Sequence, residues 1–297
     1  MSATRTVTPS AAAAHTLDEL AERVEHATVL DGVGSAIAKV IDRALPDGGV
    51  RDVASGVPIG HPAHPLLVTV PIGSWTAATY LDLTGGDRKA ARRLVGLGVL
   101  AAVPAAVTGS NDWLTTRKAE RRVGLVHAAL NNVALVLYGA SWLARRRGRQ
   151  ARGVLLSLAG LSVTGASGWL GGHLSYALGI GVDHTAFEHL PGEWTDACAE
   201  SDVPATGATS VEIDGVPVLV TRDGGEIVAL ADRCTHRGGP LHEGEIADGC
   251  VTCPWHGTQF ALRDGTVRRG PGTRPQPTLQ VRVENGRVQL RRASQDD

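Results

Sequence analysis

Four long apolar stretches in the first two thirds of the chain constrain its fold more than any other feature. Each approaches the ~20 residues that an α-helix needs to cross the hydrocarbon core of a bilayer. Basic clusters flank the stretches and few charges lie inside them. A soluble bundle of buried helices is the alternative, but runs this long with so few interior charges favour membrane spans. The stretches cover residues 65–83, 94–114, 123–144 and 153–179.

A short motif recurs within these stretches. Residues 108–114 and 164–170 share a TG-x3-WL pattern, 56 positions apart, and the preceding stretches begin near His64 and His127. The recurrence predicts a duplicated helical hairpin, and two such hairpins form a transmembrane four-helix bundle. Chance similarity between two helices rich in small residues is the alternative. The low aromatic content of 4% and the abundance of glycine suit close packing of helices in lipid.

Four histidines gather at one predicted membrane face. His61 and His64 precede the first stretch, His127 opens the third, and His173 closes the fourth. Polar side chains within a membrane are costly and often functional. These histidines are therefore candidates to bind haem b, a quinone or a metal. The alternative is that they form hydrogen bonds with neighbouring helices or lipid headgroups.

The distribution of basic residues bears on the orientation in the membrane. The loops after the first and third stretches carry nine Lys and Arg residues, against five on the opposite face. This bias favours a multi-pass cell-membrane protein whose C-terminal domain is extracytoplasmic. Against it, about 60 polar N-terminal residues would have to cross without a signal peptide. A net charge of −1 gives no electrostatic case for nucleic acid as a partner.

Two Cys–His pairs lie near the C-terminus. Cys234-Thr-His236 and Cys253-Pro-Trp-His256 are separated by sixteen residues. Two thiolates and two imidazoles are the ligands of a [2Fe–2S] cluster in which histidines replace two cysteines on one iron. A Cys2His2 set also binds zinc, but the C-x-H spacing does not fit the finger spacings. Cys198 and Cys250 are the remaining cysteines, and no disulfide framework is expected.

The residues around these pairs resemble the Rieske family. Residues 237–241 follow the first pair, 257–260 follow the second, and 270–277 resemble the proline-rich loop that covers the cluster. The resemblance spans about residues 192–292. It implies that Cys234 and Cys253 bind one iron of a [2Fe–2S] cluster. It also implies that His236 and His256 bind the other iron.

The sequence departs from the high-potential members of this family at three positions. Gly239 and Trp255 stand where those members carry a disulfide, and Phe260 replaces a tyrosine. Fewer hydrogen bonds to the cluster sulfurs disfavour the reduced state and lower the potential, although Thr258 can still donate one. We therefore expect a ferredoxin-like cluster in the lower part of the Rieske range of about −150 to +300 mV.

The membrane region also resembles an uncharacterised bacterial family of four-span membrane domains. His61-Pro-Ala-His-Pro65 provides an HPxHP motif, and the similarity covers about residues 58–180. The resemblance implies no established activity. Together these features predict an all-α transmembrane domain followed by an all-β Rieske domain, with Gly turns separating short alternating strands. The expected limits are an N-terminal tail with amphipathic helices at 1–57 and domains at 58–185 and 190–293, residues 1–14 being disordered.

Three functional hypotheses follow. The first is a membrane-anchored electron carrier that passes single electrons between redox partner proteins. The second is a haem- or quinone-linked oxidoreductase in which the cluster is one redox centre, and the third is a redox sensor. No set of two histidines and one carboxylate for mononuclear iron is apparent outside the Cys–His pairs, so an oxygenase within this chain is not expected. Whether the chain is itself an enzyme stays open.

Overall fold

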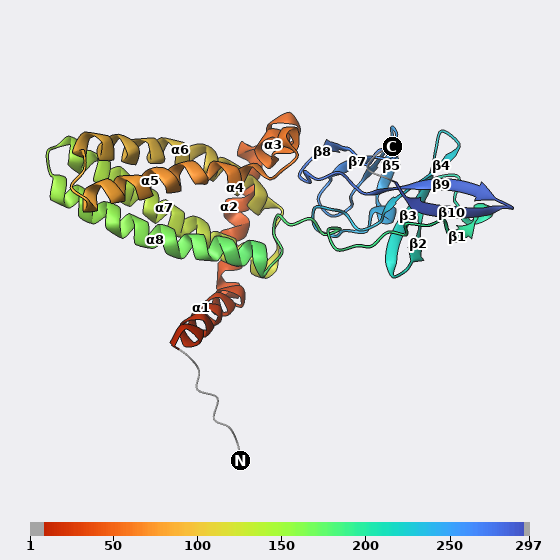
Figure 1. The fold of residues 1–297 in the computed structure, drawn as a ribbon, viewed down its shortest axis with the longest axis horizontal. Helices are drawn as coiled ribbons and strands as arrows, with labels where there is room; N and C mark the ends of the chain where they lie inside the picture. Colours follow the sequence, from red (N-terminus) through yellow and green to blue (C-terminus); the bar gives the residue numbers. More distant parts are fainter. Residues whose placement is uncertain (1–8, 294–297) are drawn as a thin grey trace, which may run out of the picture. The chain divides into compact units, whose positions relative to one another are not determined.

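The computed structural model describes residues 9–293, which divide into two compact units (Figure 1). The helical unit contains the chain up to Leu45 together with His64–Ile180. The sheet unit contains Pro46–Ala63 and the chain from Gly181 onward. The sheet unit thus takes in residues 46–63 and 181–189, which the expected domain limits leave outside the Rieske domain.

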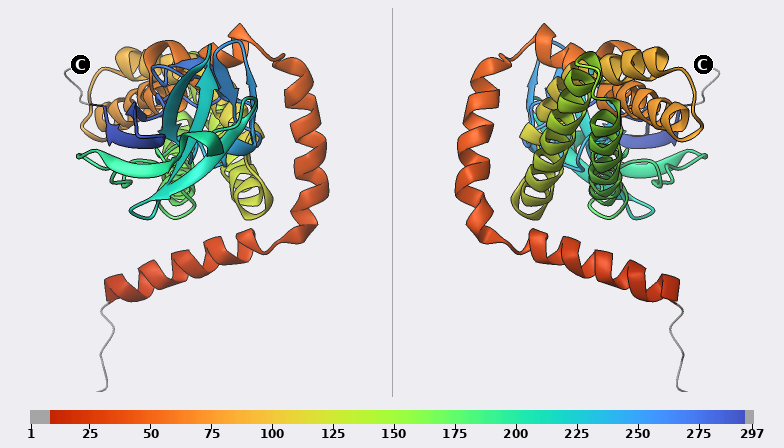
Figure 2. Two further views of the ribbon diagram at one scale, coloured as in Figure 1. Left: turned by 90° about the vertical axis from the view of Figure 1, so that its right-hand side faces the viewer. Right: turned by 90° about the vertical axis from the view of Figure 1, so that its left-hand side faces the viewer.

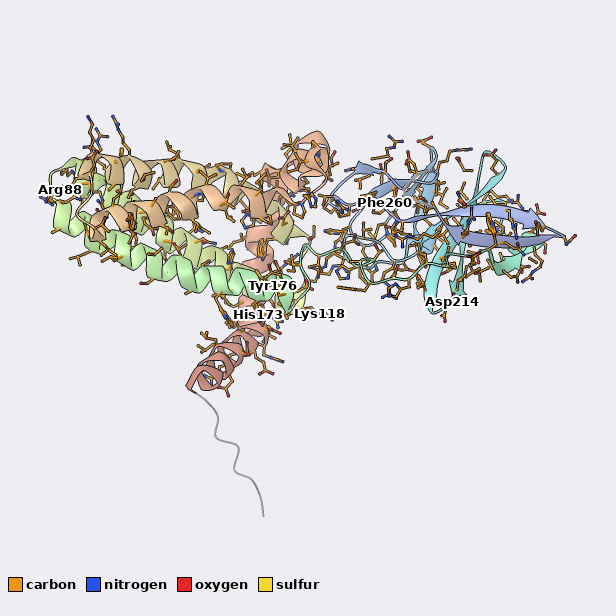
Figure 3. All side chains as sticks on the ribbon, viewed as in Figure 1. Arg88, Lys118, His173, Tyr176, Asp214 and Phe260 are labelled. Carbon is orange, nitrogen blue, oxygen red and sulfur yellow. The ribbon has the colours of Figure 1, made fainter. Side chains whose placement is uncertain are left out.

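Four helices form the body of the helical unit. α5 and α7 each pack against both α6 and α8, and the chain reverses direction at each connection (Figure 1). Arg88 lies at the opposite end of this unit from Lys118, His173 and Tyr176 (Figure 3). The helices are α5 (Thr69–Leu83), α6 (Arg88–Leu114), α7 (Lys118–Arg146) and α8 (Gln150–Tyr176).

Three of these helices, α6, α7 and α8, are long and apolar enough to cross a membrane. The first predicted stretch instead forms two helices, α4 (Ala63–Leu67) and the 15-residue α5. Pro71 explains part of this division, because it has no N–H to donate to the carbonyl of Leu67. At about 1.5 Å per residue, α5 alone is shorter than the hydrocarbon core. A fourth span therefore stays a prediction.

The interior of the helical unit is built from small polar residues around a few large rings. Trp75 and Tyr138 stack with their ring centroids 4.0 Å apart, and a Cβ at Gly98 would lie only 2.2 Å from Trp75 Nε1. Small side chains at helix interfaces let helices approach closely in lipid, where apolar burial gives little driving force. The buried serines and threonines of this unit are Ser74, Thr79, Thr108, Thr116, Ser141, Ser157, Thr164 and Ser167.

The two helical hairpins repeat, but in a different register from the TG-x3-WL motif. Gly98 accommodates the ring of Trp75, and Gly160 accommodates the ring of Tyr138 in the same way. Trp75 and Tyr138 lie 63 positions apart, and the two glycines lie 62 apart. The motif pairs residues 56 apart and therefore does not align equivalent positions of the two hairpins.

Two amphipathic helices, α1 (Pro9–Glu25) and α2 (Asp31–Ala44), precede the body of the helical unit. They are joined at a bend (Figure 2), which contains η1 (Thr28–Leu30). Arg122 of α7 binds both carboxylate oxygens of Asp31, at 2.6 and 2.8 Å. The expectation of disorder is wrong for residues 9–14, because the alanines there have high helix propensity. Residues 1–8 lie outside the described part of the chain.

The sheet unit contains two antiparallel sheets, as the alternating strands and Gly turns indicate. One has the strand order β1-β10-β9-β4-β3-β2 and the other β5-β6-β7-β8. Asp214 and Gly215 form the β2–β3 turn with positive φ at both residues, and Asp214 marks that tip in Figure 3. The strands are β1 (Thr195–Ala199), β2 (Ala208–Ile213), β3 (Val216–Asp223), β4 (Glu226–Ala231), β5 (Glu245–Ala247), β6 (Cys250–Thr252), β7 (Gln259–Ala261), β8 (Val267–Arg269), β9 (Thr278–Glu284) and β10 (Arg287–Arg292).

Short helical segments complete this unit. They are α3 (Gly49–Ser55), η2 (Val57–Ile59), η3 (Glu200–Asp202) and η4 (Leu241–Glu243). Two hydrophobic clusters form the core: the first lies against the six-stranded sheet, and the second joins both sheets. One is built around Val218, Val220 and Leu290, and the other around Leu219, Leu230 and Phe260. The second cluster also contains Cys234 and Cys253, so the candidate site lies directly on the core.

Candidate metal centre

The two Cys–His pairs lie on two turns with the same backbone pattern. In the first turn, after β4, Cys234 N donates to Gly239 O and Gly238 N donates to Cys234 O. In the second turn, between β6 and β7, Cys253 N donates to Thr258 O and Gly257 N donates to Cys253 O. Gly238 and Gly257 both have positive φ, which a glycine adopts without steric cost. Each turn thus presents its cysteine and histidine from an equivalent, rigid frame.

The structure brings the four predicted ligands together as two pairs. The thiol of Cys234 donates a hydrogen bond to the sulfur of Cys253, and both residues are buried. The rings of His236 and His256 lie edge to face, with centroids 5.1 Å apart. Within the described residues, no group of three or more His, Cys, Asp and Glu side chains could hold a single metal ion. Two thiols beside two imidazoles is the arrangement that the two irons of a Rieske cluster require.

Backbone amides surround both sulfurs. The N–H groups of His236 and Arg237 point to the sulfur of Cys234, and those of Trp255 and His256 point to Cys253. Amide donors of this kind stabilise thiolates and help to set the potential of iron–sulfur clusters. The donor set therefore fits a [2Fe–2S] cluster held by two thiolates.

The protonation states of the ligands also suit metal binding. Burial lowers the pKa of His236 to about 3, so its imidazole is neutral at pH 7. Its Nδ1 atom is buried and has no hydrogen-bond partner, as a metal-binding nitrogen requires. The hydrogen bond from the Cys234 thiol lowers the pKa of Cys253 to about 7, whereas the same pairing raises the pKa of Cys234. One proton is therefore readily lost from the thiol pair.

The proline-rich loop packs against both turns. Thr258 is fully buried, and its Oγ1 accepts a hydrogen bond from Gly272 N at 2.9 Å. Because the oxygen serves there as acceptor, the hydroxyl hydrogen of Thr258 remains available for donation. Thr235 Oγ1 donates to Arg274 O at 3.0 Å. The loop thereby joins the two ligand-bearing turns.

Gln276 was not singled out from the sequence, yet it anchors this loop. Its side chain is 2% exposed. Nε2 donates to the carbonyls of Ala231 and Arg233 at 2.7 and 2.9 Å, and Oε1 accepts from Thr235 N at 3.1 Å. Its position between two prolines could have drawn attention to it. A loop that covers a core leaves backbone groups buried, and the amide side chain of glutamine can form hydrogen bonds with them.

The positions that depart from the high-potential pattern lie beside the cysteines. A Cβ at Gly239 would lie 2.9 Å from Trp255 Cγ and 3.0 Å from Cys253 Sγ, so the indole occupies the space beside that glycine. Trp255 remains 45% exposed. Phe260 is fully buried in the second hydrophobic cluster and is labelled in Figure 3. All four cysteines of the chain are free thiols.

A segment that precedes the strands also supports the first turn. His184 N donates to Thr235 O at 3.0 Å, and Arg233 pairs with Glu188 at 3.1 Å. Burial raises the pKa of Glu188, although Arg233 opposes that shift. No motif marks this contact in the sequence, because it joins segments that are about fifty residues apart along the chain.

The histidines of the helical unit are engaged with other helices. His64 Nδ1 donates to Ala105 O at 2.9 Å, and His127 Nδ1 donates to Ser167 O at 2.8 Å. His127 Nε2 also accepts from Asn131, while His173 pairs with Glu25 at 2.8 Å. His61 belongs to the other compact unit and is exposed. Hydrogen bonding between helices, the alternative to binding a redox group, accounts for the contacts of His64 and His127.

Two family models match separate parts of the chain. Residues 193–281 match "Rieske [2Fe-2S] domain", and residues 60–184 match "Predicted membrane protein (DUF2231)". The first match covers both ligand turns. The second covers α5 to α8, including the three helices that are long and apolar enough to cross a membrane.

Individual proteins are similar to about the C-terminal third of the chain. Apoptosis-inducing factor 3 of Mus musculus is 35% identical over 98 residues, which are 33% of this chain and 16% of that protein. The 3-phenylpropionate/cinnamic acid dioxygenase ferredoxin subunit of Escherichia coli (strain K12) is 38% identical over 94 residues, covering 31% of this chain and 87% of the subunit. A Sphingomonas yanoikuyae B1 ferredoxin structure is 24% identical and covers 34% of this chain and 100% of its own, with a TM-score of 0.33.

The chain thus spans about a sixth of the length of the first relative but nearly all of the ferredoxin subunit. The sheet unit is homologous to ferredoxin components of dioxygenases.

Proposed function

This chain belongs to the Rieske [2Fe-2S] family through residues 193–281, and we propose that it is a membrane-anchored carrier of single electrons. The observation that carries the proposal is the pair of equivalent turns, which places two thiols together and two imidazoles together. We assign Cys234 and Cys253 to one iron, and His236 and His256 to the other. When bound, the cluster supplies one-electron redox chemistry.

The residues around the ligands have distinct roles in this proposal. The amides that point to the two cysteine sulfurs stabilise the thiolates, and burial keeps His236 neutral. Thr258 supplies a hydroxyl donor, whereas Phe260 supplies none. Trp255, half exposed beside His256, contributes an aromatic surface next to the imidazoles. This combination supports a potential in the lower part of the Rieske range of about −150 to +300 mV.

Membrane anchoring rests on the match of residues 60–184 and on the helices α6, α7 and α8. The excess of Lys and Arg around the α5–α6 and α7–α8 connections, most of it in the adjoining helix ends, supports an extracytoplasmic sheet unit. A fusion of alkaline phosphatase after the last residue tests on which side of the membrane the sheet unit lies, because this enzyme is active only outside the cytoplasm. Activity of the fusion is expected, and an inactive fusion made in equal amount would place the sheet unit in the cytoplasm.

The partners follow from the relatives. One relative is named as a ferredoxin subunit of a dioxygenase, so we propose that this chain likewise exchanges electrons with a separate redox protein. The haem- or quinone-linked oxidoreductase has less support, because His64, His127 and His173 form hydrogen bonds within the helical unit. No observation favours the redox sensor over the carrier.

A redox titration of the full chain in lipid nanodiscs tests the carrier. We expect one electron per chain, retained in Cys198→Ala and lost in Cys234→Ala. Cys198 is the matched control, because it is a buried free cysteine that lies outside both ligand turns. More than one electron per chain would reveal a second redox centre and favour the oxidoreductase.

A further inference from the structure

A segment from far upstream lies against the proline-rich loop. α3 and η2 belong to the same compact unit as the strands. Asp52 Oδ1 accepts a hydrogen bond from Gly270 N at 2.8 Å, across 218 positions of sequence. Gly270 opens the loop that continues through Gly272 to Gln276. The carboxylate therefore satisfies a backbone donor at the start of the loop.

The contact is closely fitted at Gly270. A Cβ at this residue would lie 3.1 Å from Val57 Cγ2, 3.2 Å from Asp52 Oδ1 and 3.5 Å from Ser55 Oγ. Ser55 is only 3% exposed, so its side chain is buried at this contact. Asp47 adds a looser ion pair with Arg269 at 3.8 Å. Arg269, the last residue of β8, and Gly270, the first residue of the loop, thus both meet the same segment.

The segment is held in shape by Gly56. This residue has a φ of 94°, and a Cβ on it would lie 2.0 Å from the carbonyl oxygen of His61. Only glycine allows the chain to fold back on itself at this point. The fold-back brings Val57 against Gly270 while Asp52, on the preceding helical turn, reaches the amide of the same residue.

From Gly270 the contacts continue to a proposed cluster ligand. Gly272 N donates to Thr258 Oγ1 at 2.9 Å, and a Cβ at Gly272 would lie 3.3 Å from His236 Cβ. Thr258 is fully buried beneath the loop. The loop is therefore clamped on one side by the α3 segment and on the other by the two ligand turns.

We propose that Asp52 is a positioning residue that holds the proline-rich loop closed over the cluster. The inference rests on the proposed function, because it concerns the surroundings of the same cluster. A closed loop limits the access of water to the cluster, and access of water helps to set its potential. Loss of the Asp52 contact opens the loop, lets water stabilise the reduced, more negative cluster, and raises the potential.

Hydrogen exchange of the full chain in nanodiscs, read by mass spectrometry over the peptide containing Gly270, tests the contact. We expect Asp52→Ala to speed exchange there about tenfold, the equivalent of one charge-assisted hydrogen bond. Asp52→Asn keeps an acceptor oxygen and should stay close to wild type. Asp47→Ala removes a carboxylate from the same segment without touching Gly270 and should leave exchange unchanged.

The midpoint potential, measured on the same samples, tests the consequence. Asp52→Ala should raise it, whereas Asp52→Asn and Asp47→Ala should not, although each removes one negative charge. Gly270→Ala offers a second route, because its methyl group pushes Val57 and Asp52 away from the loop. It should reproduce the faster exchange and the higher potential if Asp52→Ala fails to fold.

Wild-type exchange in Asp52→Ala and Gly270→Ala would overturn the inference. Equal potential shifts in Asp52→Ala and Asp47→Ala would also overturn it, because they would reflect charge alone. Absence of any cluster signal from the wild-type chain would instead refute the proposed function. The exchange result would then still decide whether Asp52 holds the loop.

Discussion

Asp82 and Arg145 form a bidentate ion pair inside the helical unit, with Nη1–Oδ1 and Nη2–Oδ2 distances of 2.8 and 2.5 Å. Their side chains are only 2% and 1% exposed. Ser141 and Ser157 accept further hydrogen bonds from the guanidinium at 3.1 and 3.2 Å. Because both side chains are buried, each charge depends on the other for compensation.

Removing one member of this pair should be far more damaging than removing both. Arg145→Met leaves the Asp82 carboxylate buried alone, and we expect a loss of about 3–5 kcal/mol of stability. The double variant with Asp82→Leu should regain most of it, because neither charge remains. Thermal aggregation of the detergent-solubilised protein measures the difference. A double variant as unstable as the single one would contradict mutual compensation.

Two residues beside the cluster should move its potential in opposite directions. Thr258→Val removes a hydroxyl donor worth about 1.4 kcal/mol, which corresponds to a decrease of about 59 mV in the midpoint potential for one electron. Loss of the Gly272 N contact to the same oxygen opposes this shift, so the net decrease should be smaller than about 60 mV. Phe260→Tyr adds a donor and should raise it. Redox titration checks both, with Thr258→Ser as the control that keeps a hydroxyl. Equal shifts in Thr258→Ser and Thr258→Val would rule out a role for the hydrogen bond.

Gln276 should determine how long the cluster is retained. Gln276→Ala leaves the amide of Thr235 in the first turn, and the carbonyls of Ala231 and Arg233 just before it, without this partner, at a cost of about 2–3 kcal/mol. We expect cluster loss on warming to become about a hundredfold faster. The decay of visible absorbance measures this rate. Gln289→Ala is the control, because the side chain of Gln289 accepts a hydrogen bond from Arg282 on β9, away from the ligand turns. An equal acceleration in this variant would contradict the prediction.

Loading of the apo-protein should depend on pH through the thiol pair. Metal ligands must lose their protons, and the first thiol proton leaves near the Cys253 pKa of about 7. Cluster yield from iron and sulfide should therefore fall as pH drops below about 7. His236 does not limit loading there, because its pKa is about 3. A yield that stays constant from about pH 8 down to about pH 5.5 would contradict this dependence.

The ligand turns were predictable because their geometry is local. A cysteine, a histidine two or three residues later and a following glycine specify each turn within six residues. The short spacing places the ligands on one turn, and the glycine permits the positive φ that the turn requires. The pairing of Cys234 with Cys253 depends on a longer distance, and here the resemblance to a family supplied what spacing alone did not.

Other features depend on contacts between distant segments and left little trace in the sequence. The Asp52–Gly270 contact joins residues 218 positions apart, and no motif marks either of them. The register of the helical repeat was missed because the TG-x3-WL motif is more conspicuous than the Trp75–Tyr138 stack. A tryptophan and a tyrosine occupy equivalent positions but do not look alike in the sequence.

The length of the first helix was overestimated for a local reason. Hydrophobicity continues across residues 65–83, but Pro71 removes one backbone donor and the helix is divided before Thr69. Hydropathy measures the preference for lipid and does not detect such a break.

EPR spectroscopy of membranes detects both the [2Fe–2S] cluster and its anchoring in one sample. Membranes from cells that express the full chain are washed with carbonate, reduced with dithionite and assayed for iron and zinc per chain. We expect a Rieske-type signal that resists the wash, two irons per chain, loss of the signal in Cys234→Ala and retention in Cys198→Ala. A signal that washes away, or one zinc per chain with no reducible cluster, would contradict it.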